Sequence, residues 1–159
     1  MGNYLDELNA LIQKADYYQH DLKDDVEAEK LYREALRFPD CAPRYILGKF
    51  LFFDGRTDEG ELFVTAAADE GYPPAAVFKA MQYLNANGLP IKDDSLVSIL
   101  SVAAEKGHLM AKQILVENEL KQTSSFRKMF RLAVQLRKLI KQIKKIQNNP
   151  DAPQDHVWF

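Results

Sequence analysis

The segments GELFVTAAADEG (residues 60–71) and LVSILSVAAEKG (residues 96–107) decide the fold, because they carry one apolar pattern twice, 36 positions apart. In each segment two large apolar residues are followed by two alanines and then, three positions further on, by a glycine. A weaker copy runs from Ala28 to Leu36. Sequence repeats of this period are typical of helix pairs stacked side by side. The chain therefore predicts an all-α fold.

Apolar residues spaced three and four apart, interrupted by turn residues, predict eight helices. We place them at about 4–19, 26–38, 43–53, 59–70, 73–84, 95–107, 109–121 and 125–148. Gly71 stands where a helix commonly ends on a left-handed residue. Gly48 lies inside a predicted helix, where glycine costs about 1 kcal/mol relative to alanine. We therefore expect a second helix to pass close to Gly48, since no Cβ would intervene.

The two clear copies resemble Sel1-like repeats, a branch of the tetratricopeptide-repeat superfamily. The endings Ala67-Ala68-Asp69-Glu70-Gly71 and Ala103-Ala104-Glu105-Lys106-Gly107 carry the resemblance, together with Ala75 and Ala111 four residues after each glycine and Tyr83 at the aromatic position. The resemblance implies a short right-handed α-solenoid of about three to four helix pairs, and we expect a bacterial protein. It assigns residues 1–122 to the solenoid, 123–148 to a basic amphipathic capping helix, and 149–159 to a C-terminal tail.

The net charge of −2 conceals two segments of opposite sign. Residues 1–120 carry 21 acidic and 12 basic side chains, a net of −9, whereas residues 121–149 carry nine basic and no acidic side chains. The single cysteine, Cys41, is typical of a reducing compartment. The first residues lack the basic and apolar regions of a signal peptide, and no stretch of about 20 apolar residues occurs. We therefore expect a cytoplasmic protein.

Catalytic and metal-binding patterns are weak in this sequence. His20, His108 and His156 lie far apart and have no partner at metal-ligand spacing, so we expect neither a metal nor another cofactor. The paired carboxylates at 24–25 and 93–94 each open a predicted helix, where acidic residues usually act as caps. No phosphate-binding loop or nucleophile motif is present. A hydrolase is the alternative from the enzyme class, and we expect no enzymatic activity.

The resemblance places the first helix of each pair along a concave groove. The candidate groove residues are long polar or aromatic side chains, which peptide-binding grooves use: Arg44, Lys49, Phe53, Lys79, Gln82, Tyr83, Lys112 and Gln113. The sequence thus favours a non-enzymatic adaptor or regulatory scaffold that binds a protein or peptide. An immunity or inhibitor protein, which neutralises an enzyme or toxin through its acidic surface, is the alternative within the binding class.

The predicted helix 125–148 has a heptad-like apolar seam, and Phe126, Phe130, Ala133 and Ile140 widen its first half. Its opposite face is basic: Arg127, Arg131, Lys138, Lys141 and Lys145. This helix could cap the solenoid, which the wide stripe favours, or its seam could pair with a second copy or a partner helix. As a third interpretation, it could contact an anionic membrane surface or RNA. We expect no DNA binding, because the acidic body would repel phosphates.

The tail ends in Val157, Trp158 and Phe159, an apolar group at a position where chains are usually polar. We predict that these three residues dock, either in the protein's own groove or on another chain.

Overall fold

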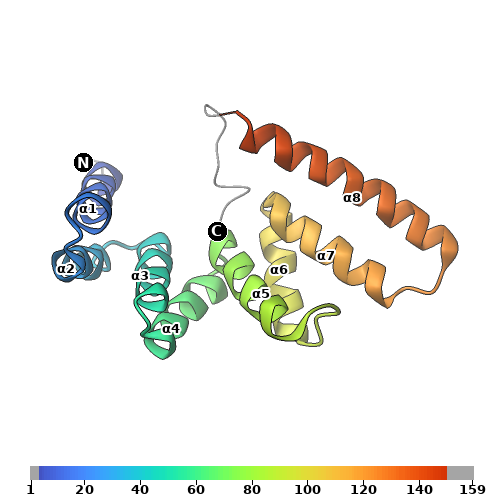
Figure 1. Ribbon diagram of the computed structural model, residues 1–159, viewed down its shortest axis with the longest axis horizontal. Helices are drawn as coiled ribbons and strands as arrows, with labels where there is room; N and C mark the ends of the chain where they lie inside the picture. Colours follow the sequence, from blue (N-terminus) through green and yellow to red (C-terminus); the bar gives the residue numbers. More distant parts are fainter. Residues whose placement is uncertain (1–3, 150–159) are drawn as a thin grey trace. The chain divides into compact units, whose positions relative to one another are not determined.

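The computed structural model describes residues 4–149, and all secondary structure in that range is helical. The all-α prediction is therefore confirmed for this part of the chain. In order, the elements are α1 (Tyr4–Tyr17), the π-helix η1 (Tyr18–Leu22), α2 (Asp25–Ala35), α3 (Ala42–Phe53), α4 (Thr57–Asp69), α5 (Pro73–Asn87), α6 (Asp94–Glu105), α7 (Leu109–Gln122) and α8 (Phe126–Gln147) (Figure 1). None of these helices is both long and apolar enough to cross a membrane.

Helix boundaries follow the turn and capping residues that the sequence indicated. The Asp24 carboxylate accepts a hydrogen bond from the Glu27 N–H at 3.1 Å and caps α2. Asp93 likewise caps α6 by accepting from the N–H groups of Ser95 and Leu96. Gly71 has a φ of +80°, in the left-handed region expected of a residue that ends a helix. The paired carboxylates thus lie at helix N-termini, where their charge complements the helix dipole.

The end of the first helix differs from the prediction. We expected a turn after residue 19, but the chain continues through the π-helix η1 and ends at Lys23, whose φ is +56°. A π-helix shifts the hydrogen bonds by one residue and widens the turn, which apolar periodicity does not reveal. This segment brings Gln19 and His20 beside α3, as described below.

The described part of the chain divides into two compact units, with the division after residue 67. In the first unit α2 packs against α1 and α3. Its core is formed by small residues where helices approach and by large ones between them: Ala15, Ala28, Leu31, Tyr32, Leu47, Phe50 and Leu51. The two helices α3 and α4 meet at a pair of glycines.

Gly48 of α3 and Gly60 of α4 bring two backbones into direct contact. A Cβ at Gly48 would lie 2.8 Å from the Gly60 carbonyl oxygen, and a Cβ at Gly60 would lie 2.6 Å from the Gly48 carbonyl oxygen. Backbone atoms cannot rotate away as a flexible side chain can, so either methyl group would force the helices apart. The close approach expected at Gly48 is confirmed.

We predict that Gly48→Ala and Gly60→Ala each lower the free energy of unfolding by about 1–3 kcal/mol, although alanine is the better helix former. Chemical denaturation measures this change. Glu61→Ala is the matched control, because it adds alanine at the adjacent exposed position of α4 and should change stability by less than about 0.5 kcal/mol. Unchanged or raised stability in both glycine variants would contradict the close approach.

The second unit packs α6 between α5 and α7. The alanines that the repeat pattern shares are buried in this unit. They include Ala103 of the second repeated ending and Ala75 and Ala111, which lie four residues after each glycine. The long loop before Asp93 is held at two points, because the Ile91 N–H donates to Asn118 Oδ1 at 2.7 Å and the Lys92 N–H donates to the Tyr83 hydroxyl oxygen at 3.0 Å. The predicted boundary at residues 122–123 falls inside this unit, between α7 and α8.

The long helix α8 lies alongside α7 (Figure 1). Leu132, Leu139 and Ile143 of its apolar seam are buried, and the first two pack with Val116 of α7. Of the four residues that widen its apolar stripe, Phe126, Phe130 and Ala133 are exposed and Ile140 is half-buried. A single neighbouring helix covers only a narrow seam, and α7 is the helix on which α8 packs.

Candidate functional site

An open cleft of about 320 Å³ lies in the first unit, between the α1–η1 segment and α3. Side chains of α1, η1, α2 and α3 line it: Ile12, Asp16, Gln19, His20, Tyr32, Tyr45, Ile46, Lys49, Phe50 and Phe53. Aromatic and aliphatic groups thus alternate with a few polar ones. A second hollow of about 120 Å³ shares Gln19, Phe50 and Phe53 with the first and adds Asp25 and Asp54. The two hollows therefore adjoin.

A hydrogen-bond cluster orders the polar side of the cleft. The Tyr32 hydroxyl donates to Asp16 Oδ1 at 2.6 Å, and Gln19 Oε1 lies 3.0 Å from the same hydroxyl oxygen. Burial, together with the adjacent Asp16 carboxylate, raises the pKa of Tyr32 above its usual range, so the phenol keeps its proton. Because Tyr32 is buried, this contact fixes the α1–η1 junction to α2.

Two residues of α3 give the cleft its chemical character. Burial of the Lys49 side chain lowers the pKa of its ammonium group. Phe53, one turn further along α3, is 69% exposed although it lines both hollows. An exposed aromatic ring beside an apolar depression is a feature of interaction surfaces, where such side chains supply much of the contact energy.

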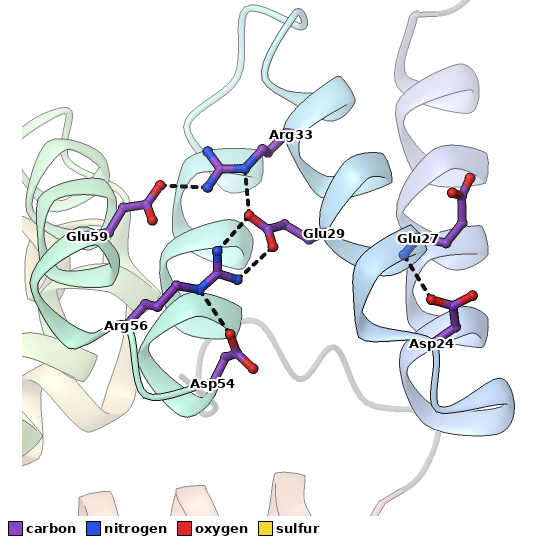
Figure 2. Close-up of polar contacts among 7 residues, drawn as sticks. All are labelled: Asp24, Glu27, Glu29, Arg33, Asp54, Arg56 and Glu59. Atoms are coloured by element: carbon purple, nitrogen blue, oxygen red, sulfur yellow. Dashed lines mark hydrogen bonds and ion pairs between the residues drawn. The ribbon is translucent and has the colours of Figure 1, made fainter.

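An ion-pair network lies at the C-terminal end of α3 (Figure 2). Its member Asp54 also lines the second hollow. Arg56 binds the Glu29 carboxylate with two hydrogen bonds of 2.9 and 2.6 Å, and its Nε donates to Asp54 at 2.9 Å. Arg33 donates both to Glu29 at 2.7 Å and to Glu59 of α4 at 2.6 Å. The network thereby joins α2 to both sides of the α3–α4 turn, and so it helps to position Phe53.

The Glu29 network predicts a pH dependence of stability. The hydrogen bonds from Arg56, together with the one from Arg33, hold the pKa of Glu29 below its ordinary value. A carboxyl group with a lowered folded-state pKa stabilises the fold above its unfolded pKa of about 4.3, and this contribution is lost as the pH falls through the folded value. We expect Glu29→Gln to cost about 1 kcal/mol at pH 7, because the arginines are partly solvent-screened.

Denaturation of wild type and Glu29→Gln between pH 7 and about pH 3 measures this effect. The difference between them should be constant near neutral pH and should shrink below about pH 4. Glu61→Gln is the control, because Glu61 is exposed on the same unit, and it should show a small difference at every pH. A Glu29→Gln difference that is independent of pH would contradict the assignment.

The structure brings some of the predicted groove residues together. Lys49 and Phe53 line the cleft, whereas Arg44, on the same helix, is half-buried and does not line it. In the second unit Lys79, Gln82 and Tyr83 share a face of α5, and Lys112 and Gln113 lie on α7. The Tyr83 hydroxyl is engaged by the loop, and Gln113 donates to Glu117 at 2.8 Å.

Of the ten residues that line the cleft, sequence reasoning predicted only Lys49 and Phe53 as groove residues. Asp16, Gln19 and His20 were not predicted, since they reach the cleft through the π-helix turn and the Tyr32 contact. Tyr32 was predicted only as a core residue, although it is both buried and cleft-lining. The sequence held one signal for these residues. The polar side chains of Asp16, Gln19 and His20 interrupt the apolar pattern at the C-terminal end of the first helical segment.

The remaining candidate residues lie away from the cleft or outside the described part of the chain. His108 is fully buried and caps α7, accepting from the Ala111 N–H at 3.4 Å through Nδ1. Between residues 4 and 149, no three His, Cys, Asp or Glu side chains gather in a way that could hold a metal ion. The five basic-face residues of α8 are exposed, namely Arg127, Arg131, Lys138, Lys141 and Lys145. His156, Val157, Trp158 and Phe159 lie outside the described residues.

Comparisons with protein-family models, with curated proteins and with solved structures find no match to this chain.

Proposed function

We propose that this protein is a non-enzymatic interaction module whose cleft beside α3 receives a side chain of a protein or peptide partner. The observation that carries the proposal is Phe53, which is 69% exposed at the edge of an apolar cleft that also contains Lys49. Leaving a phenylalanine in water is unfavourable, and covering it with a partner recovers that free energy. The volume of about 320 Å³ lies at the low end of small-molecule pockets, which suits one or two partner side chains.

The charges around the cleft favour a partner segment that is both apolar and basic. Asp16, Asp25 and Asp54 line the two adjoining hollows, and residues 1–67 carry 14 acidic and eight basic side chains, a net charge of −6. Complementary charge speeds encounter and disfavours acidic competitors. This same preference is the observation that favours the second candidate function, an inhibitor or immunity protein that neutralises a basic surface of an enzyme or toxin.

The architecture that we propose around this cleft is a short right-handed solenoid of Sel1-like helix pairs in a cytoplasmic protein. It rests on the repeated endings at 67–71 and 103–107 and on the covered alanines of each pair. The groove residues of the second unit, Lys79, Gln82, Tyr83, Lys112 and Gln113, stay predicted partner contacts. Of the two proposed contact regions, the cleft of the first unit is the one whose volume and lining residues are described.

We predict that a photo-crosslinking amino acid at position 53 captures one defined partner in the source cells, whereas the same group at position 62 does not. Leu62 is the matched control, because it is 72% exposed in the same unit but does not line the cleft. The identified partner, once purified, should bind Phe53→Ser at least about tenfold more weakly than wild type, because a buried aromatic contact is lost. Leu62→Ser should bind like wild type.

Two results would overturn the proposal. Equal crosslinking from positions 53 and 62 would show non-specific contact, and equal affinity of Phe53→Ser and wild type would place the interface elsewhere. Because Phe53 and Leu62 are both exposed, the two serine variants should keep the wild-type melting temperature, so that a loss of binding reports on the cleft and not on folding.

A further inference from the structure

The face of α8 that points away from α7 combines exposed apolar residues with unopposed positive charge. Phe126, Phe130 and Val134 are 81%, 67% and 41% exposed, and their four-residue spacing places them on one stripe. Arg137 and Lys141 continue that stripe towards the C-terminus of the helix. We call Phe126, Phe130, Val134, Arg137 and Lys141 the outer stripe. Its first half is apolar and its second half is cationic.

No acidic side chain offsets this charge locally. Residues 121–149 contain nine Lys or Arg and neither Asp nor Glu. Lys128 pairs with Glu119 of α7 at 2.8 Å, on the side of α8 that faces its neighbour. Within residues 4–149, no acidic partner is found for Arg127, Arg131, Arg137, Lys138 or Lys141. The outer stripe is therefore flanked by exposed cations that have no acidic partner among the described residues.

We propose that the outer stripe of α8 binds an anionic membrane surface, with the helix lying in the plane of the interface. Helices of this kind place aromatic and aliphatic side chains among the acyl chains and hold Lys and Arg at the level of the headgroups. Phe126, Phe130 and Val134 would enter the apolar layer, and Arg127 and Arg131 beside them would reach lipid phosphates. Leu132 and Leu139 stay packed on α7, so the protein binds as a folded unit.

Other occupants fit the outer stripe less well. A second copy docked on the same face would bring two sets of unopposed cations together, which is unfavourable. Single-stranded RNA could stack on two phenylalanines, but Val134, Ala133 and Met129, which are also exposed, offer bases no aromatic face. Aliphatic side chains beside exposed aromatic ones suit acyl chains better than nucleobases.

The test is flotation of the full chain with vesicles of phosphatidylcholine alone or with roughly one third phosphatidylserine. We expect binding to the anionic vesicles only, and a steep loss of binding when salt is raised from about 0.1 to about 0.5 M. Phe126→Ser combined with Phe130→Ser should weaken binding about tenfold or more, because both apolar anchors are removed. Replacing Arg131 and Lys138 by Gln should weaken it about fivefold per charge.

Matched controls separate the outer stripe from general apolar or charge effects. Val26→Ser with Leu62→Ser removes two equally exposed apolar residues of the first unit, and Lys92→Gln removes an exposed cation from a loop. Both controls should bind like wild type. A polarity-sensitive dye attached through Phe130→Cys, in a Cys41→Ser background, should shift to the blue on anionic vesicles. The same dye attached through Leu62→Cys should not shift.

Four outcomes would overturn the inference. Three concern binding: no binding to anionic vesicles, equal binding of the double phenylalanine variant and wild type, or tighter binding to poly-uridine RNA than to vesicles. The fourth is a dimer in sedimentation that Phe126→Ser dissociates, which would assign the stripe to a second copy. This inference is independent of the cleft, since none of its variants alters a residue that lines the cleft.

Discussion

The contact between Gly48 and Gly60 is the constraint on which the first unit depends. Two helix backbones can approach within van der Waals distance only where neither carries a Cβ, and here each glycine faces the other's carbonyl oxygen. That contact sets how α4 lies on α3, and the Glu29 network joins the same two helices to α2 (Figure 2). The opposite side of α3 then faces α1 and η1, and the cleft forms between them.

Both proposed interaction surfaces arise where the regular pattern is interrupted or ends. The π-helix turns Gln19 and His20 towards α3, so the cleft owes its polar wall to an irregular helix end. In the later part of the described chain, α8 packs on α7, and Phe126 and Phe130 on its outer face are exposed.

Sequence reasoning predicted the helices well because their signals are local. Asp24 and Asp93 cap the helices that they precede, and Gly71 ends α4 with a left-handed φ, as expected. Gly48 was informative because glycine lowers the stability of a helix interior. Its presence there therefore indicated that another helix packs closely against it. The π-helix escaped prediction because its residues read as an ordinary turn. Most of the cleft was missed because its residues come from four elements, α1, η1, α2 and α3, whose relative positions no local pattern encodes.

The amino-acid sequence by itself determined the helix content, the caps, the positions of the small residues and the segregation of charge, since each depends on neighbours within a few positions of the chain. Tertiary structure decided which apolar residues are covered. Phe126 and Phe130 belong to the same amphipathic pattern as Leu132 and Leu139, yet only the leucines are buried. The physical reason is that burial depends on how many neighbours a helix meets, and α8 meets α7 along one narrow seam.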